Sequence, residues 1–189
     1  MNTVEPIKDL EKITAMKKVL RAQNSRNYLL FTMGINTGLR ISDLLSFNVQ
    51  DVNDGKEKIR EKITIQEQKT GKRKQFMLNT NTRKALQEHI FQQKLQPGDY
   101  LFQSRKGDNQ PISRVQAWNI LNQAARTVGI TSNIGTHTLR KTFGYHAYQN
   151  GTDITLLQKV FNHSSPAITL RYIGITQEEI DNVYINLNL

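Results

Sequence analysis

The chain has 189 residues, of which 26 are Lys or Arg and 16 are Asp or Glu, giving a formal net charge of +10. This length allows one domain with a core of its own, and residues 1–189 are expected to form a single domain. Cysteine is absent, which excludes disulfides, thiolate chemistry and cysteine-based zinc sites. The sequence has neither a secretory signal nor an apolar run of membrane-spanning length, so we expect a cytoplasmic protein without membrane contact.

The positive charge is spread over segments with the periodicity of helices and strands, and no tail concentrates it. An excess of this size attracts polyanions, among which nucleic acid is the first candidate. A surface charged only for solubility is the alternative. The distribution favours a folded, basic binding face.

The first part of the chain predicts helices. Apolar residues recur at helical spacing over residues 7–22, and Asn24 or Ser25 caps a second helix that ends at Gly38. A short helix is expected over residues 41–47.

The period then changes to that of β-strands. Alternating apolar residues on both sides of the turn Lys69-Thr70-Gly71-Lys72 predict an antiparallel hairpin over residues 59–79. Helices follow over about 80–94 and from Ser113 to Val128.

The last third predicts four more helices. Their starts are marked, in chain order, by His137, Asp153, Ser165-Pro166 and the capping-box pair Thr176 and Glu179. The fold class is therefore α+β and predominantly helical, a multi-helix domain with a small antiparallel β-sheet.

Six polar residues scattered along the chain are the candidates for a functional site: Arg40, Lys69, His137, Arg140, His163 and Tyr172. Taken alone, each of these residues has an ordinary structural interpretation, such as a surface cation, a salt-bridge partner or a histidine that packs in the core. Their types, order and spacing, with Tyr172 nine positions after His163, resemble the catalytic domain of the tyrosine recombinases. This is the phage integrase family, which includes the Xer resolvases, and the resemblance runs from about Ile7 to Tyr184.

Arg40 and Arg140 suit a phosphodiester. Guanidinium groups are planar, stay protonated and bind phosphate oxygens in bidentate fashion. Arg140 lies one helical turn after His137, so both project from the same face. Asp43, one turn after Arg40, either pairs with that arginine or is a solvated carboxylate.

The resemblance implies a reaction and a role for each group. Tyr172 would attack a DNA phosphate, expel a 5′-hydroxyl and leave a 3′-phosphotyrosyl bond, with no metal or other cofactor. A phenol has an ordinary pKa of about 10, and the nearby arginines and histidine are expected to favour the phenolate. His137 would be a hydrogen-bond partner or general base, and His163 would donate to a non-bridging oxygen.

The family's lysine matches Lys69, which the resemblance makes the general acid. The alternative is a basic turn in which Lys69, Lys72, Arg73 and Lys74 contact phosphates nonspecifically. One departure concerns Asn162, where relatives usually have a glycine before the histidine. Asparagine tolerates the positive φ expected there.

The resemblance also implies partners. We expect double-stranded DNA, a monomer in solution, a homotetramer on paired DNA sites, and accessory DNA-binding proteins. Relatives usually carry an N-terminal helical DNA-clamping domain. We expect residues 1–189 to be the catalytic domain without it, either as a natural single-domain recombinase or as a catalytic fragment. Residues 176–189 either exchange onto a neighbouring protomer or pack on their own core. The predicted function is site-specific DNA recombination; the alternatives are a catalytically inactive DNA-binding module and a type IB topoisomerase-like strand relaxer.

Overall fold

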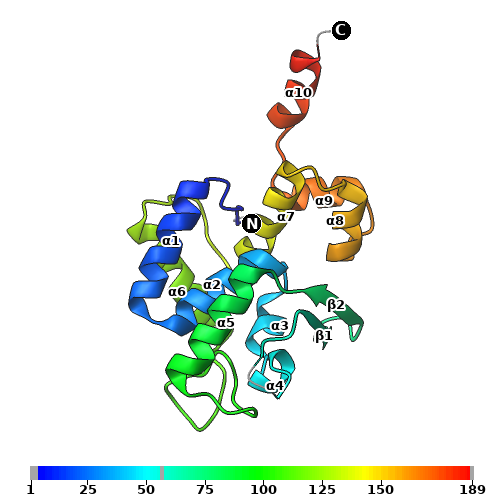
Figure 1. The fold of residues 1–189 in the computed structure, drawn as a ribbon. Coiled ribbons are helices and arrows are strands. Elements are labelled where there is room, and N and C mark those ends of the chain that lie inside the picture. The colour runs from blue at the N-terminus through cyan, green and yellow to red at the C-terminus, as the bar shows by residue number, and fades with distance from the viewer. Residues whose placement is uncertain (1–3, 56–57, 188–189) are drawn as a thin grey trace.

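The computed structural model describes residues 4–55 and 58–187. In chain order the described part forms α1 (Leu10–Gln23), α2 (Ser25–Thr37), α3 (Ile41–Leu45), α4 (Val49–Val52), β1 (Lys62–Gln66), β2 (Arg73–Met77), α5 (Thr80–Gln93), α6 (Arg114–Thr127), α7 (Thr138–Gln149), α8 (Ile154–Phe161), α9 (Pro166–Ile173) and α10 (Gln177–Asn186). The predicted class, a mostly helical fold with a small antiparallel sheet, is confirmed (Figure 1).

The helix boundaries follow local signals in the sequence. Asn24 ends α1, and its side chain accepts a hydrogen bond from the Asn27 amide at the start of α2. Gly38 ends α2 with a φ of 61°, in the left-handed region that glycine adopts without strain. Asp153 caps α8 as predicted, whereas the four-residue helix α4 was not predicted, although Asp51 accepts a hydrogen bond from the Asn48 amide at its start.

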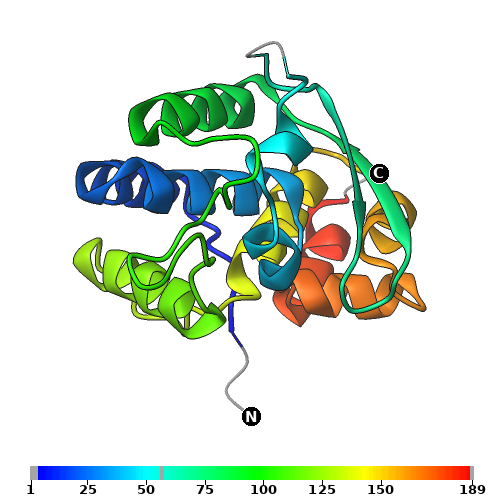
Figure 2. The same ribbon diagram turned by 90° about the horizontal axis from the view of Figure 1, so that it is seen from below.

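Helix α2 is the centre of the fold. Leu29, Leu30, Phe31 and Met33 are fully buried, because α2 contacts α1, α5 and α7. Figure 2 shows α5, the α1–α2 pair and α6 as three layers on one side of the molecule. One apolar cluster joins α2 to α3, α5 and β1, and a second joins it to α1, α6 and α7.

Strands β1 and β2 form the predicted antiparallel hairpin. The register places Ile63 opposite Phe76 and Ile65 opposite Lys74. The hairpin runs beside α8 (Figure 2), to which Lys74 makes a hydrogen bond. It therefore connects the α2–α5 part of the fold to the last helices of the chain.

Helices α7, α8 and α9 pack around a smaller cluster whose buried members are Leu157, Phe161 and Ile173. Gly144 of α7 allows this approach, since a Cβ there would lie 2.6 Å from the Ile173 side chain and 2.7 Å from the Phe161 ring. The helix that carries Tyr172 is thereby held directly against α7.

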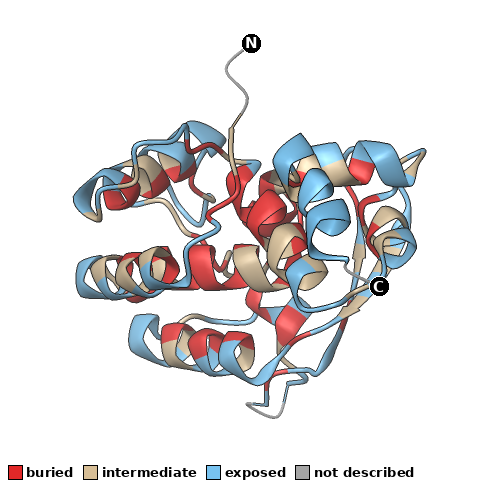
Figure 3. Ribbon diagram, turned by 90° about the horizontal axis from the view of Figure 1, so that it is seen from above, coloured by how far each residue is buried: buried red, intermediate tan, exposed pale blue. Residues whose placement is uncertain are grey.

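Helix α10 projects away from the other helices (Figure 1), and none of its described residues is buried. Its exposed surface is visible in Figure 3, and it includes the apolar side chains of Val183, Tyr184 and Ile185. The predicted Thr176–Glu179 capping box is present at its start. Within the described ranges, no helix is both long and apolar enough to cross a membrane.

Candidate functional site

Arg40 is placed by the turn between α2 and α3. It is the N-cap residue of α3 and follows Gly38 by two positions. A Cβ on Gly38 would lie 2.4 Å from the ring of Phe143 in α7, so the turn packs closely against that helix. The backbone carbonyl of Gly38 also accepts a hydrogen bond from Arg140. These contacts bring the two arginines, one hundred residues apart in the sequence, to the same place.

Arg140 is buried in α7 and is held by backbone carbonyls. Besides the bond from its Nη1 to Gly38, its Nη2 donates to the Phe161 carbonyl at 3.1 Å. Its guanidinium carbon also lies 4.5 Å from the centroid of the Phe161 ring. Fixed partners on two other segments leave the guanidinium little freedom, which suits an anion-binding group.

Tyr172 packs in a group of three rings. Its ring centroid lies 4.9 Å from that of His163 and 5.5 Å from that of Phe161, both with edge-to-face geometry. The Nζ of Lys141 lies 5.4 Å from the Tyr172 ring centroid. The Tyr172 hydroxyl is 3.5 Å from Nδ1 of His137, the residue that precedes α7. The rings therefore set the orientation of the phenol toward His137.

The two arginines favour the Tyr172 phenolate as expected, but burial opposes them and outweighs their effect. Burial raises the pKa of Tyr172, and the opposing effects of Arg140 and Arg40 do not fully cancel it. Without DNA the side chain is therefore a neutral phenol, and the arginines alone do not produce the phenolate. Deprotonation needs a base.

His137 is suited to be that base. Partial desolvation of the imidazole, and then the positive charges of Arg140, Lys141 and Arg40, lower the pKa of His137 below its usual value. The ring is therefore neutral at pH 7 and has a nitrogen free to accept a proton.

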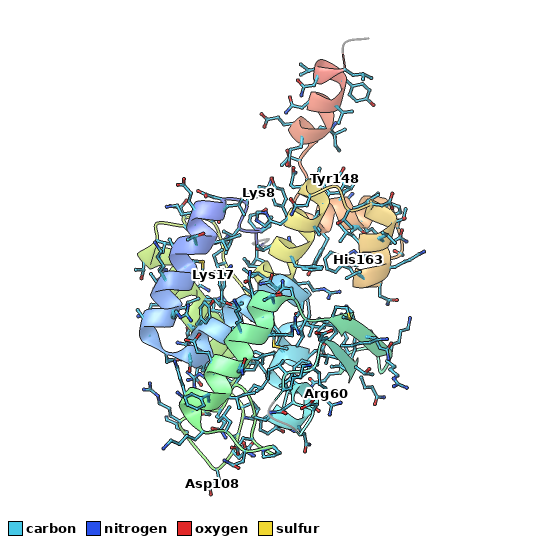
Figure 4. All side chains as sticks on the ribbon, viewed as in Figure 1. Lys8, Lys17, Arg60, Asp108, Tyr148 and His163 are labelled. Atoms are coloured by element: carbon cyan, nitrogen blue, oxygen red, sulfur yellow. The ribbon has the colours of Figure 1, made fainter. Side chains whose placement is uncertain are left out.

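His163 lies in the α8–α9 connection, after the residue that ends α8. Figure 4 shows it at the end of α8 that faces the hairpin. Its Nδ1 is 3.1 Å from the hydroxyl of the buried Thr169, so Nε2 is available to a substrate. Asn162, immediately before it, has a φ of 55° and confirms the left-handed geometry expected at this position.

Lys69 is exposed in the turn between β1 and β2. It lines an open hollow of about 890 Å³ together with Arg40 and His137, and its charge contributes to lowering the pKa of His137. Among the described residues, Lys69 has no hydrogen-bond or ion-pair partner. The structure thus places Lys69 at the edge of the site, with its side-chain nitrogen unpartnered among the described residues.

Sequence reasoning missed the nearer of the two carboxylates that pair with Arg40. Glu67 Oε1 lies 2.7 Å from Arg40 Nη1, whereas Oδ2 of Asp43 is 4.0 Å from the same atom. Burial by itself raises the pKa of Glu67, but the Thr70 hydrogen bond and the charges of Arg40 and Lys74 outweigh it and lower that pKa. Glu67 is therefore an ionised partner of Arg40. Its position two residues before Lys69 was the available signal.

Asp43 is buried and forms a longer ion pair with Arg40, which confirms the expected pairing, and it also holds the hairpin turn. Its Oδ1 accepts a hydrogen bond from the Gln68 amide at 3.0 Å, while Glu67 accepts one from the Thr70 hydroxyl at 2.7 Å. The two carboxylates thereby fix the backbone on both sides of Lys69 to α3 and Arg40.

The remaining histidines have structural partners. His89 is buried between the Ser25 hydroxyl and the Leu101 carbonyl, and His146 bonds the Ile7 carbonyl. In the part of the chain that the structure describes, no group of three or more His, Asp or Glu side chains is arranged to hold a metal ion.

The site combines two held guanidinium groups, a phenol and a neutral imidazole. The guanidinium groups match the non-bridging oxygens of a phosphodiester, and the imidazole can take the phenol proton. This arrangement matches the groups that phosphoryl transfer to a tyrosine requires.

Comparison with known proteins gives the same class. Residues 7–179 match the model described as the phage integrase family. The chain is 43% identical over 184 residues to the probable integrase/recombinase YoeC of Bacillus subtilis, and the match covers 97% of both proteins. It is 29% identical over 163 residues to tyrosine recombinase XerD of Corynebacterium glutamicum, covering 84% of this chain but 51% of that longer relative.

Among solved structures, the XerH site-specific recombinase in its post-cleavage complex with DNA superposes with a TM-score of 0.75. The match has 22% identity and covers 95% of this chain and 51% of XerH, so it shows a shared fold. The chain belongs to the phage integrase family. Its class is that of the tyrosine-type site-specific DNA recombinases.

Proposed function

We propose that this protein cleaves and rejoins DNA through a covalent 3′-phosphotyrosine at Tyr172, as the chemical step of site-specific recombination. The observation that carries this proposal is the position of the Tyr172 hydroxyl, 3.5 Å from neutral His137 and beside Arg140. The family match and the similarity to YoeC support it. We further propose that the protein acts in the cytoplasm on double-stranded DNA.

In the proposed reaction, a backbone phosphate lies between Arg40 and Arg140, whose charges stabilise the extra negative charge of the pentavalent transition state. His163 donates a hydrogen bond from Nε2 to a non-bridging oxygen. This requires a proton on Nε2, and the bound phosphate favours that proton by offsetting the nearby arginine charges.

His137 accepts the phenol proton of Tyr172 while the Tyr172 oxygen forms a bond to phosphorus. The bond from phosphorus to the 5′-oxygen breaks, and Lys69 gives a proton to the leaving alkoxide. The products are a 3′-phosphotyrosyl ester and a free 5′-hydroxyl. Religation is the reverse, so the reaction needs no external energy source.

The nucleophile is tested with a DNA duplex nicked close to the cleavage site. Cleavage then releases a short fragment that carries the new 5′-hydroxyl. This fragment diffuses away, so religation cannot occur and the covalent intermediate is trapped. The wild type should form an adduct that withstands denaturation, and Tyr172→Phe should form none. Tyr148→Phe is the matched control, because it removes a phenol from the neighbouring helix α7. An adduct with Tyr172→Phe, or none with the wild type, would refute the assignment.

The role of Lys69 is tested with a 5′-bridging phosphorothiolate, in which sulfur replaces the leaving oxygen. A thiolate leaves without a proton, so Lys69→Ala should cleave the ordinary substrate slowly and the sulfur substrate at the wild-type rate. Equal losses on both substrates would assign Lys69 to phosphate binding instead.

For the assembly, we propose a monomer in solution and a homotetramer on paired sites, with accessory DNA-binding proteins that help to hold the DNA. The exposed apolar face of α10 supports exchange of residues 176–189 onto a neighbouring protomer. A chain ending at Asn182 should keep the wild-type melting temperature and bind one site, yet fail to pair two sites in a gel-shift assay. Loss of folding would show that the segment packs on its own chain.

A further inference from the structure

Two cations bind the last carbonyl groups of α8. The carbonyls of Gln158 and Lys159 accept hydrogen bonds from the backbone of the residues that end the helix. Those of Val160 and Phe161 have no backbone partner among the residues that the structure describes, as is usual in the last turn of a helix. Lys74 Nζ donates to the Val160 carbonyl at 2.9 Å, and Arg140 Nη2 donates to the Phe161 carbonyl. One of these cations is the site's own arginine, and the other comes from the hairpin.

Lys74 points inward from β2. Along this strand the partly buried residues are Lys74 and Phe76, while Arg73, Gln75 and Met77 are exposed. A second contact lies beside the first, because Lys72 Nζ is 3.2 Å from Asn162 Oδ1. The strand that follows the Lys69 turn is therefore bonded to the end of α8.

The position of Lys74 is electrostatically unfavourable. Burial, followed by repulsion from Arg140, lowers the pKa of Lys74 to about 8, although Glu67 opposes this shift. A lysine has a long, flexible side chain that ordinarily extends its ammonium group into water. The bond to the Val160 carbonyl and the nearby carboxylate of Glu67 retain it beside the arginines instead.

The hairpin is held from both sides. Asp43 and Glu67 bond the Lys69 turn on the α3 side, and Lys74 bonds the returning strand on the α8 side. We propose that Lys74 is a positioning residue for strand cleavage: by joining β2 to the end of α8, it fixes the hairpin that presents Lys69 to the leaving 5′-oxygen. This inference rests on the proposed function of Lys69 as the general acid.

The test uses single-turnover cleavage by the full chain at saturating DNA. Lys74→Met keeps the apolar stem and removes the charged donor. A misplaced group costs up to about a hundredfold in rate, so we expect Lys74→Met to be roughly tenfold to a hundredfold slower on the ordinary substrate. On the 5′-bridging phosphorothiolate, which needs no proton from Lys69, it should match the wild type.

Two further variants separate positioning from general damage. Lys62→Met makes the same change on an exposed residue of β1 and should match the wild type on both substrates. Lys74→Arg keeps a charged donor and should restore most of the cleavage rate. Melting temperatures show whether each variant is folded, and Lys74→Gln replaces Lys74→Met if the latter does not fold.

The inference is overturned if Lys74→Met behaves like Lys62→Met, or if its loss persists on the phosphorothiolate substrate. A wild type that forms no covalent adduct refutes the proposed function itself. If the wild type forms the adduct and Lys74→Met cleaves at the wild-type rate, the inference about Lys74 is refuted while the proposed function stands.

Discussion

Replacing Gly144 by alanine tests whether the close approach of α7 to α9 sets the position of Tyr172. The added Cβ would lie 2.6 Å from Ile173 and 2.7 Å from two atoms of the Phe161 ring, both of them buried residues. Adding a methyl group to a filled core costs about 1–3 kcal/mol, and three contacts this short place the cost at the upper end.

Part of this cost is offset, because alanine favours a helix over glycine by about 1 kcal/mol. The expected net loss is about 2 kcal/mol, which lowers the melting temperature of a domain of this size by about 4–8 °C. The cleavage rate should also fall, since α9 carries Tyr172 and must move away from Arg140.

The assays are thermal unfolding followed by circular dichroism and covalent-adduct formation on nicked DNA. Gly98→Ala is the control, because a Cβ there meets no atom within 4 Å. Gly144→Ala melting at the wild-type temperature and forming adduct at the wild-type rate would refute this account of the packing.

Three other predictions concern charge. The cleavage rate should fall by about tenfold per pH unit once the pH is below the pKa of His137, which is itself lower than usual, because the protonated ring cannot accept the Tyr172 proton. A rate that stays constant down to the lowest pH at which the protein is folded would exclude His137 as the base. Glu67→Ala should lose about 1–3 kcal/mol of stability, measured by urea unfolding, because Arg40 loses its ionised partner; unchanged stability would contradict the ion pair's importance. DNA affinity should fall with salt at a log–log slope of about −0.9 for each phosphate contacted, and a slope near zero in binding titrations would exclude the basic face as the contact surface.

The sequence predicted the elements with strong local signals. The cap at Asn24, the turn at Gly38, the hairpin and the Thr176–Glu179 capping box each depend on residues within a few positions of one another, and all are present. The short helix α4 was missed, because four residues give no periodicity to recognise.

The six candidate site residues were assigned from their resemblance, in type and spacing, to the tyrosine recombinases. The structure brings Arg140, His137, Tyr172 and His163 into contact or near contact. The residues that hold them were not assigned. Glu67 and Lys74 act across the hairpin on partners far away in the sequence, and a linear pattern contains no distance between them. The inward face of β2, shared by Lys74 and Phe76, was the usable signal.

The pKa of Tyr172 could not be judged from sequence, since it depends on how burial compares with the two arginine charges. Spacing indicated the arginines but said nothing about how much water the fold removes from the phenol. The sign of the shift is therefore a property of the packing of α9 against α7 and α8.

Helices α8 and α9 share a small cluster in which the fully buried side chains described are Leu157, Phe161 and Ile173, while the core around α2 is much larger. Regions with few buried apolar contacts open first when a protein is heated or stressed. Tyr172, the proposed nucleophile, lies in this weaker region, whereas Arg40 is attached to the core. Partial unfolding would therefore displace Tyr172 before it disrupted the core that holds Arg40, so the proposed strand cleavage should be lost at a lower temperature than the rest of the fold.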